Sequence, residues 1–330
     1  MSLALLGCEQ QPARPAQQST PQTPAPGAGA TAPTPAAATP ARTGYADVHG
    51  ARHYYQVYGD LASGGTPLLV LHGSLMSADA MAPLAVRFAR NRPVIALDAR
   101  GHGRTPDVPG PITYERLADD AAGVLQALHV PTADVLGYSM GGTTAIVLAL
   151  RHPERVRKLI PVSGPYSREG WYPEVRAGFD RWSPTMLAGS GLEAEYRRLS
   201  PTPDGLGGLI LKLKAMETAP YAWPEDRIRA LGAPTMVVVG DADGEQLVHA
   251  VRLFGLRGGG DREAATTGYL AAAPRARLAV LPGTSHVGMM ARAQLLVDVV
   301  TPFLDDETPP LPDNFLKPGP GVVPPERPKP

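Results

Sequence analysis

The chain has 330 residues, and its 31 lysines and arginines balance 31 aspartates and glutamates, so its formal net charge is zero. This balance excludes a protein that binds nucleic acid or coats an anionic membrane through a basic surface. Because Cys8 is the single cysteine, the sequence also excludes an internal disulfide and a cysteine-rich metal site.

Proline divides the chain into a middle part and two tails. Residues 1–43 hold 8 of the 37 prolines, and residues 305–330 hold 9. Such segments bury too little apolar surface to offset the entropy of ordering, so we expect both tails to be disordered. Residues 44–304 then have the length of one domain. The sequence contains no run of about 18 apolar residues, so it predicts no membrane span.

The N-terminal tail carries a second pattern. Leu5-Leu6-Gly7-Cys8 resembles the lipobox of bacterial lipoproteins, in which the cysteine is lipidated and becomes the mature N-terminus. Residues 9–43 have the composition of a flexible tether. The basic n-region and the full apolar stretch of a signal peptide are missing, so this interpretation needs a start further upstream. It predicts export and membrane anchoring through Cys8; the alternative is a cytoplasmic protein with a loose N-terminus.

Within residues 44–304, predicted strands alternate with predicted helices. Residues 45–58 predict a hairpin around His49-Gly50. Short apolar runs predict buried strands at residues 67–72, 93–98, 133–137, 156–163, 234–240 and 276–281. Helical spacing of apolar residues predicts helices at 80–90, 114–128, 141–151, 246–254 and 289–304. This alternation is typical of a doubly wound, mostly parallel α/β sheet.

Residues 164–226 interrupt the alternation. They contain no strand candidate, yet they hold 8 of the chain's 19 aromatic residues, including all three tryptophans. We predict an inserted helical cap over one end of the sheet. Trp171 and Trp182 are candidates for substrate contact, together with Tyr138 from the motif described next. The alternative is that these aromatic side chains only pack the cap against the core.

A Gly-x-Ser-x-Gly motif, Gly137-Tyr138-Ser139-Met140-Gly141, follows a predicted strand and precedes a predicted helix. In that context the motif forms a tight turn that exposes the serine hydroxyl, and the helix directs free N–H groups toward developing negative charge. We therefore predict Ser139 to be a nucleophile. The alternative role of a turn serine that caps a helix is much weaker in this context.

A nucleophilic serine needs a base and an acid that orients the base. Of the downstream histidines, His152 is typical of a helix C-terminus and His249 lies within a predicted helix, whereas His286 lies in a loop just beyond a strand. Loops at the carboxyl ends of parallel strands hold the chemistry of such sheets, so we choose His286. Asp243 follows the strand at 234–240 and gives the chain order serine, acid, histidine. Asp241 is its competitor, with the alternative role of fixing the turn through backbone hydrogen bonds.

The oxyanion formed during acyl transfer needs two backbone N–H donors. His72-Gly73-Ser74 follows the apolar run Leu68–Leu71, where the second donor for such a serine turn belongs. We assign the donors to Ser74 and Met140, and we expect His72 to orient the loop by hydrogen bonds.

Five segments, in this order, resemble the α/β-hydrolase superfamily, in particular its capped, esterase-like serine hydrolases. They are His72-Gly73 and residues 98–104, 137–142, 240–243 and 283–289. The resemblance implies the fold, the triad and a loop at 98–104 beside the active site, and it supports Asp243 as the acid. The chain departs from the family at two places. Thr105 stands where a serine is commoner in the family. Residues 256–269 lengthen the link between the acid and the histidine, and we interpret them as a surface insertion.

These observations predict a serine hydrolase that cleaves an ester-like bond of a small or medium, apolar substrate through an acyl-enzyme, with no metal or organic cofactor. The first alternative is an acyltransferase or carbon–carbon bond hydrolase with the same triad. The second is a ligand-binding relative without turnover. The partner is a small molecule and not nucleic acid, and the oligomeric state is open.

Overall fold

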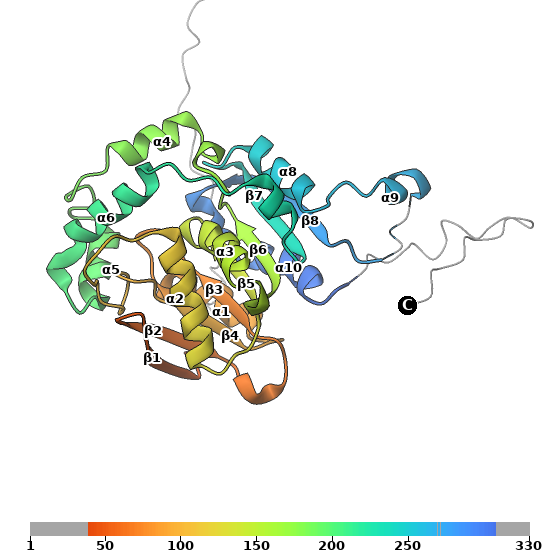
Figure 1. The fold of residues 1–330 in the computed structure, drawn as a ribbon. Coiled ribbons are helices and arrows are strands. Elements are labelled where there is room, and N and C mark those ends of the chain that lie inside the picture. Colours follow the sequence, from red (N-terminus) through yellow and green to blue (C-terminus); the bar gives the residue numbers. More distant parts are fainter. Residues whose placement is uncertain (1–38, 269, 271, 308–330) are drawn as a thin grey trace, which may run out of the picture. The chain divides into compact units, whose positions relative to one another are not determined.

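We describe the computed structural model over residues 39–268, 270 and 272–307. Over these residues eight strands form one sheet in the order β1-β2-β4-β3-β5-β6-β7-β8 (Figure 1). The strands are β1 (Arg42–Val48), β2 (Ala51–Tyr58), β3 (Leu68–Leu71), β4 (Val94–Leu97), β5 (Ala133–Tyr138), β6 (Val156–Val162), β7 (Thr235–Ala242) and β8 (Ala276–Ser285). β2 pairs antiparallel with β1 and β4, and the remaining pairs are parallel. The predicted doubly wound, mostly parallel α/β fold is confirmed.

The helices alternate with the parallel strands as expected, and they lie on both sides of the sheet (Figure 1). They are α1 (Ala78–Phe88), α2 (Tyr114–Ala127), α3 (Met140–Arg151), α4 (Pro173–Asp180), α5 (Gly191–Leu199), α6 (Leu206–Thr218), α7 (Glu225–Arg229), α8 (Leu247–Leu256), α9 (Arg262–Thr267) and α10 (Ala293–Leu304). The helix predicted at 289–304 is in fact a 3₁₀ segment, Val287–Arg292, followed by α10.

The predicted tails lie almost wholly outside the described residues. β1 begins at Arg42, two residues before the boundary predicted from composition. At the other end, Asp305, Asp306 and Glu307 follow α10. Cys8 lies outside the described residues.

The sheet separates two apolar cores. Successive residues of a strand point to opposite faces, so Leu69 and Leu71 of β3 join one core while Leu68 and Val70 join the other. The first core lies between the sheet and α2, α3 and α8, and the second lies between the sheet and α1 and α10. Because the parallel strands are buried on both faces, they read as continuous apolar runs in the sequence.

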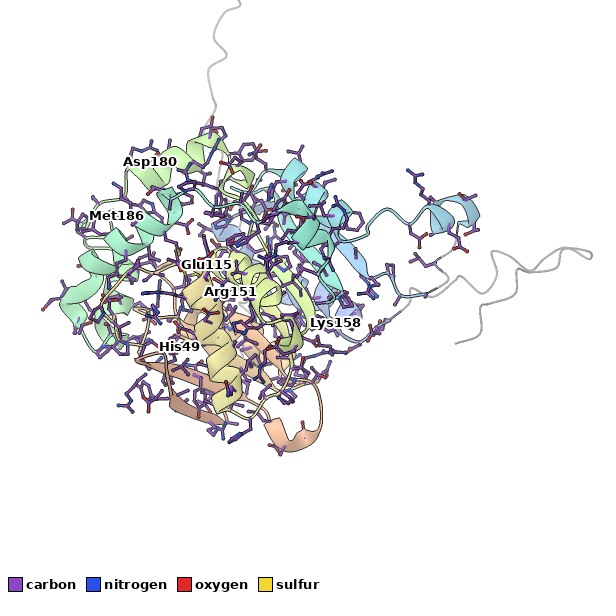
Figure 2. The ribbon with its side chains drawn as sticks, in the orientation of Figure 1. His49, Glu115, Arg151, Lys158, Asp180 and Met186 are labelled. Atoms are coloured by element: carbon purple, nitrogen blue, oxygen red, sulfur yellow. The ribbon has the colours of Figure 1, made fainter. Side chains whose placement is uncertain are left out.

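One described segment, Val287–Leu304, has the length and mean hydropathy of a membrane span. Its residues Leu296, Val300 and Phe303 are buried in the second core. The ammonium of Lys158 on β6 also donates to the carbonyl oxygens of Phe303 and Leu304, at 2.8 and 2.9 Å (Figure 2 labels Lys158). These contacts make α10 a core helix of the domain, in which apolar residues are expected.

Residues 164–226 lie between β6 and β7 and contain α4, α5, α6 and the start of α7. Asp180 at the end of α4 and Met186 beyond it lie on this inserted segment (Figure 2). Its strand-like pairings are two isolated bridges, which join Ser167 to Ala222 and Trp171 to Glu245. The segment therefore consists of short helices joined by loops.

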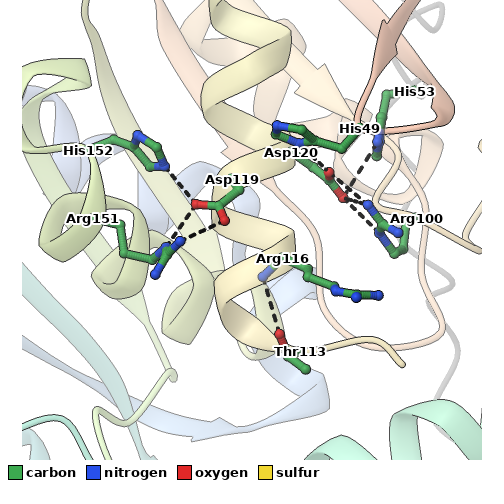
Figure 3. Close-up of polar contacts among 9 residues, drawn as sticks. All are labelled: His49, His53, Arg100, Thr113, Arg116, Asp119, Asp120, Arg151 and His152. Atoms are coloured by element: carbon green, nitrogen blue, oxygen red, sulfur yellow. Dashed lines mark hydrogen bonds and ion pairs between the residues drawn. The ribbon is translucent and has the colours of Figure 1, made fainter. Parts of the chain in front are cut away.

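Two adjacent aspartates hold α2 between its neighbours (Figure 3). Asp119 accepts hydrogen bonds of 2.8 Å from Arg151 at the end of α3. Asp120 is buried and accepts from Arg100 at 2.8 and 2.9 Å, with the His53 ring of β2 at 3.5 Å. The loop at 98–104 is thereby fixed to α2.

Candidate active site

Ser139 lies in a strained turn between β5 and α3. Its φ of 55° and ψ of −119° place it in a backbone region that residues with side chains rarely adopt. The turn is so tight that a Cβ atom at Gly137 would lie 1.9 Å from the carbonyl oxygen of Gly141. A Cβ atom at Gly141 would lie 2.3 Å from the carbonyl oxygen of Leu71. Both glycines of the motif are therefore required by close backbone approach.

The structure brings the three predicted catalytic side chains together. The Nε2 atom of His286 lies 3.0 Å from the Oγ atom of Ser139. The Nδ1 atom of the same ring lies 2.8 Å from the Oδ1 atom of Asp243. His286 is thus in hydrogen-bond contact with both partners, the arrangement in which an imidazole accepts a proton from a hydroxyl while a carboxylate orients it.

The Asp243 carboxylate is buried and accepts hydrogen bonds from groups other than His286. Its Oδ2 atom accepts from the Ser163 hydroxyl at 2.5 Å and from the Gly240 N–H at 3.3 Å. Its Oδ1 atom also accepts from the Glu245 N–H at 3.1 Å. Burial raises the pKa of Asp243, but the interactions with His286, Ser163 and the Glu245 N–H outweigh burial and bring the pKa below its ordinary value. The group is therefore ionised at neutral pH.

No motif in the sequence marks Ser163, which is the last residue of the strand predicted at 156–163. Its contact with Asp243 depends on the pairing of β6 with β7, which places the end of β6 beside the acid. Ser163 also has a positive φ of 51°, which is rare for a residue other than glycine, but a dihedral angle cannot be read from the sequence.

Two aromatic side chains flank the His286 ring. Tyr138, next to Ser139, donates from its hydroxyl to the His286 carbonyl at 2.8 Å, and the Tyr138 and His286 ring centroids are 5.2 Å apart. The buried Trp171 meets the same imidazole edge to face at 5.4 Å. Trp182 contacts Phe179 at 5.3 Å, and Phe179 in turn contacts Trp171 at 5.9 Å.

The competing histidines and the competing aspartate have other contacts. The Nε2 atom of His152 lies 2.7 Å from Asp119, at the end of α3 (Figure 3). His249 stacks on Tyr166 and accepts from its N–H at 3.2 Å. Asp241 accepts from the N–H groups of Gly283 and Thr284 at 2.9 and 3.0 Å. Asp241 thus fixes the turn, which is the alternative role that the sequence suggests for it.

The loop after β3 lies beside the turn that holds Ser139. His72 is buried, its Nδ1 atom lies 2.8 Å from the Gly73 carbonyl, and its Nε2 atom accepts from the Ala99 N–H at 3.0 Å. Burial lowers the pKa of His72 to about 4, so the ring is neutral and rigidly placed. Met140 is the first residue of α3, and a first-turn N–H has no partner within its helix. Met140 thus follows Ser139 directly, and Ser74 follows the His72-Gly73 pair.

Comparison with known proteins agrees with this architecture. Residues 66–200 match the family described as alpha/beta hydrolase fold. The enol-lactonase from Burkholderia xenovorans LB400 superimposes with a TM-score of 0.59 at 22% identity, over 79% of this chain and 99% of that chain. The family match over residues 66–200 and the structural likeness agree that the protein has the α/β-hydrolase fold.

Curated relatives align over shorter stretches. The 2-hydroxymuconate semialdehyde hydrolase of Pseudomonas sp. strain CF600 is 43% identical over 101 residues, 29% of this chain and 35% of that protein. The sn-1-specific diacylglycerol lipase ABHD11 of Xenopus tropicalis is 35% identical over 112 residues, 33% of this chain and 34% of that protein. The chain spans about half the length, or less, of the curated relatives that it matches.

Proposed function

We propose that the protein is a serine hydrolase that cleaves an ester-like bond through an acyl-enzyme intermediate. The observation that carries this proposal is the continuous contact from Ser139 through His286 to the buried Asp243. A hydroxyl, an imidazole and an ionised carboxylate in that order are the parts that nucleophilic acyl transfer requires.

The reaction then follows from the positions of these groups. Ser139 attacks the substrate carbonyl, and His286 takes the hydroxyl proton and later returns a proton to the leaving group. Asp243 stabilises the imidazolium, because its pKa is held below the ordinary value and the group stays charged. The N–H groups of Ser74 and Met140 stabilise the tetrahedral oxyanion. Water attacks the acyl-enzyme in the second half of the reaction.

The surroundings of His286 favour a small or medium, apolar substrate. Trp171 and Tyr138 border the imidazole, and both are buried. Aromatic walls with a few polar groups are typical of pockets for apolar ligands. A relative named as a diacylglycerol lipase supports an ester as substrate.

A second candidate function is cleavage of a carbon–carbon bond by the same triad. It is favoured by the 43% identity to the protein named as 2-hydroxymuconate semialdehyde hydrolase, whose named substrate has no ester bond.

A fluorophosphonate probe and two substrates test both candidates. We expect the probe to label the wild-type protein and not Ser139→Ala, and we expect turnover within a p-nitrophenyl ester series. Turnover of 2-hydroxymuconate semialdehyde without turnover of any ester would favour the second candidate over the first. A protein that neither reacts with the probe nor turns over any substrate would contradict both.

We further propose that Cys8 carries lipid and anchors the protein to a membrane, since Leu5-Leu6-Gly7-Cys8 resembles a lipobox and residues 9–43 suit a tether. The test is expression of the genomic reading frame in a bacterium, followed by fractionation. We expect the wild-type protein in the membrane fraction and Cys8→Ala outside it. Finding both in the cytoplasm would contradict the anchor.

A further inference from the structure

Glu217, near the end of α6 in the inserted segment, is a buried carboxyl group facing the proposed oxyanion loop. The Tyr114 hydroxyl at the start of α2 lies 3.0 Å from both carboxylate oxygens. The Ser74 side chain also interacts with this carboxylate as a hydrogen-bond partner. Glu217 thus joins three parts of the chain that are distant in sequence: the inserted segment, α2 and the loop after β3.

The carboxyl group has little cationic compensation. Arg168 donates from Nε to the Glu217 backbone carbonyl at 2.9 Å, and its charge acts on the carboxylate only as a minor influence. Burial is the largest effect and raises the pKa of Glu217 to about 7, against the hydrogen bonds from Tyr114 and Ser74. A buried acid is costly unless its hydrogen bonds are made, so packing alone does not explain a glutamate here.

A line of contacts connects Glu217 to the other side of the site. Tyr114 and Tyr221 stack edge to face at 5.0 Å, and the Tyr221 hydroxyl accepts from the Trp171 indole N–H at 2.9 Å. Trp171 in turn contacts the His286 ring. The inserted segment therefore contacts the proposed base through Trp171 and the proposed oxyanion loop through Glu217.

We propose that Glu217 is a positioning residue, which holds the Ser74 loop from the inserted segment so that the Ser74 N–H meets the oxyanion. This inference rests on the serine hydrolase function proposed above. The Ser74 hydroxyl donates its hydrogen bond to the Glu217 carboxyl group, and the backbone N–H of the same residue is left to the substrate. Glu217 acts through Ser74 and does not contact the reacting atoms.

The neutral acid is the form that suits this role. The groups facing it are Tyr114 from α2, Tyr221 after α6, Ser74 after β3 and Arg168 from the 3₁₀ turn Arg168–Gly170. Ionisation would put a negative charge beside a loop that must stabilise a developing negative charge. The rate should therefore fall as the pH rises through about 7.

A double-mutant cycle on the hydrolysis of p-nitrophenyl butyrate tests the inference. We expect Glu217→Ala to lower kcat by about 10- to 100-fold with KM changed by less than about 3-fold, because misplacement of a transition-state donor affects kcat. In the Ser74→Ala background the same change should cost less than about 2-fold, because the link is already broken. Equal losses in both backgrounds would overturn the inference.

Glu217→Gln provides a second readout that does not depend on tolerance of the alanine variant. Glutamine keeps the hydrogen bonds but cannot ionise, so kcat should stay within about 3-fold of wild type at pH 6, and the alkaline loss should disappear. Retention of the wild-type alkaline loss would overturn the inference. Glu174→Gln, on the exposed side of α4, is the matched control and should keep the wild-type profile. Failure of wild-type labelling at Ser139 would instead overturn the proposed function.

Discussion

The Ser163 hydroxyl donates to Asp243 at 2.5 Å, on the carboxylate oxygen that His286 does not contact. This bond lowers the pKa of Asp243 and fixes the plane of its carboxylate. We expect Ser163→Ala to lower kcat by about 10-fold, the scale of one lost hydrogen bond to a charged group. The acid limb of the pH–rate profile should move to higher pH, because the pKa of Asp243 rises. The exposed Ser63→Ala is the control, and an unchanged profile for Ser163→Ala would exclude this role.

Asp243 and Asp241 should respond differently to the same substitution. Asp243→Asn should lower kcat by about 10⁴-fold, as in another serine triad, because the imidazole loses its orienting charge. Asp241→Asn should mainly lower the free energy of unfolding, because it weakens the bonds to Gly283 and Thr284. Ester kinetics and urea unfolding of both variants provide the measurement. The reverse pattern would assign the acid to Asp241.

His72 should make the fold sensitive to acid. Its pKa is lowered to about 4 in the folded protein, so between that value and its ordinary value of about 6.5 the unfolded chain binds more protons. Stability is then lost as the pH falls, by about 2 kcal/mol between pH 7 and pH 5 for this group. We expect His72→Asn to reduce this pH dependence in urea unfolding, and the exposed His129→Asn to leave it unchanged.

The turn between β5 and α3 should not tolerate even one methyl group at Gly141. A Cβ atom added there would overlap the Leu71 carbonyl oxygen at 2.3 Å, so Gly141→Ala should lower the free energy of unfolding by at least about 3 kcal/mol. Gly255→Ala is the control, since nothing lies within 4 Å of its added Cβ in α8. That change should stabilise the protein by up to about 1 kcal/mol. Equal thermal unfolding of the two variants would contradict this interpretation of the turn.

The two tryptophans should differ in their effect on substrate preference. Trp171 contacts His286, whereas Trp182 is separated from it by Phe179. We expect Trp171→Ala to shift the preferred acyl length in the p-nitrophenyl ester series toward longer chains, and Trp182→Ala to shift it less. Unchanged preference in both variants would mean that these side chains only pack the inserted segment.

The sequence predicts the architecture well because its strongest signals are local. The apolar runs lie in the parallel strands, and the turn that contains Gly137, Ser139 and Gly141 is marked by a motif of five consecutive residues. Boundaries that depend on pairing were less predictable. β7 and β8 extend beyond their apolar runs to Ala242 and Ser285, because pairing continues past a register irregularity after Gly240.

The supporting residues of the site could not be read from sequence in the same way. Ser163 and Glu217 carry no motif, and each gains its contact from an element far away in the chain. Glutamate in an amphipathic helix normally predicts a solvated position, whereas here the start of α2 covers it. Only the packing of α6 against the domain reveals the difference.

His286 follows β8, the last strand at one edge of the sheet. It lies 147 residues from Ser139 and 43 from Asp243, so the contact among them exists only while this edge strand is paired with β7. Edge strands open with less free energy than central ones. Mild denaturant should therefore release β8 before the central strands β3 and β5 exchange their amide hydrogens. Ser139 would then lose its contact with His286 while most of the sheet is still folded.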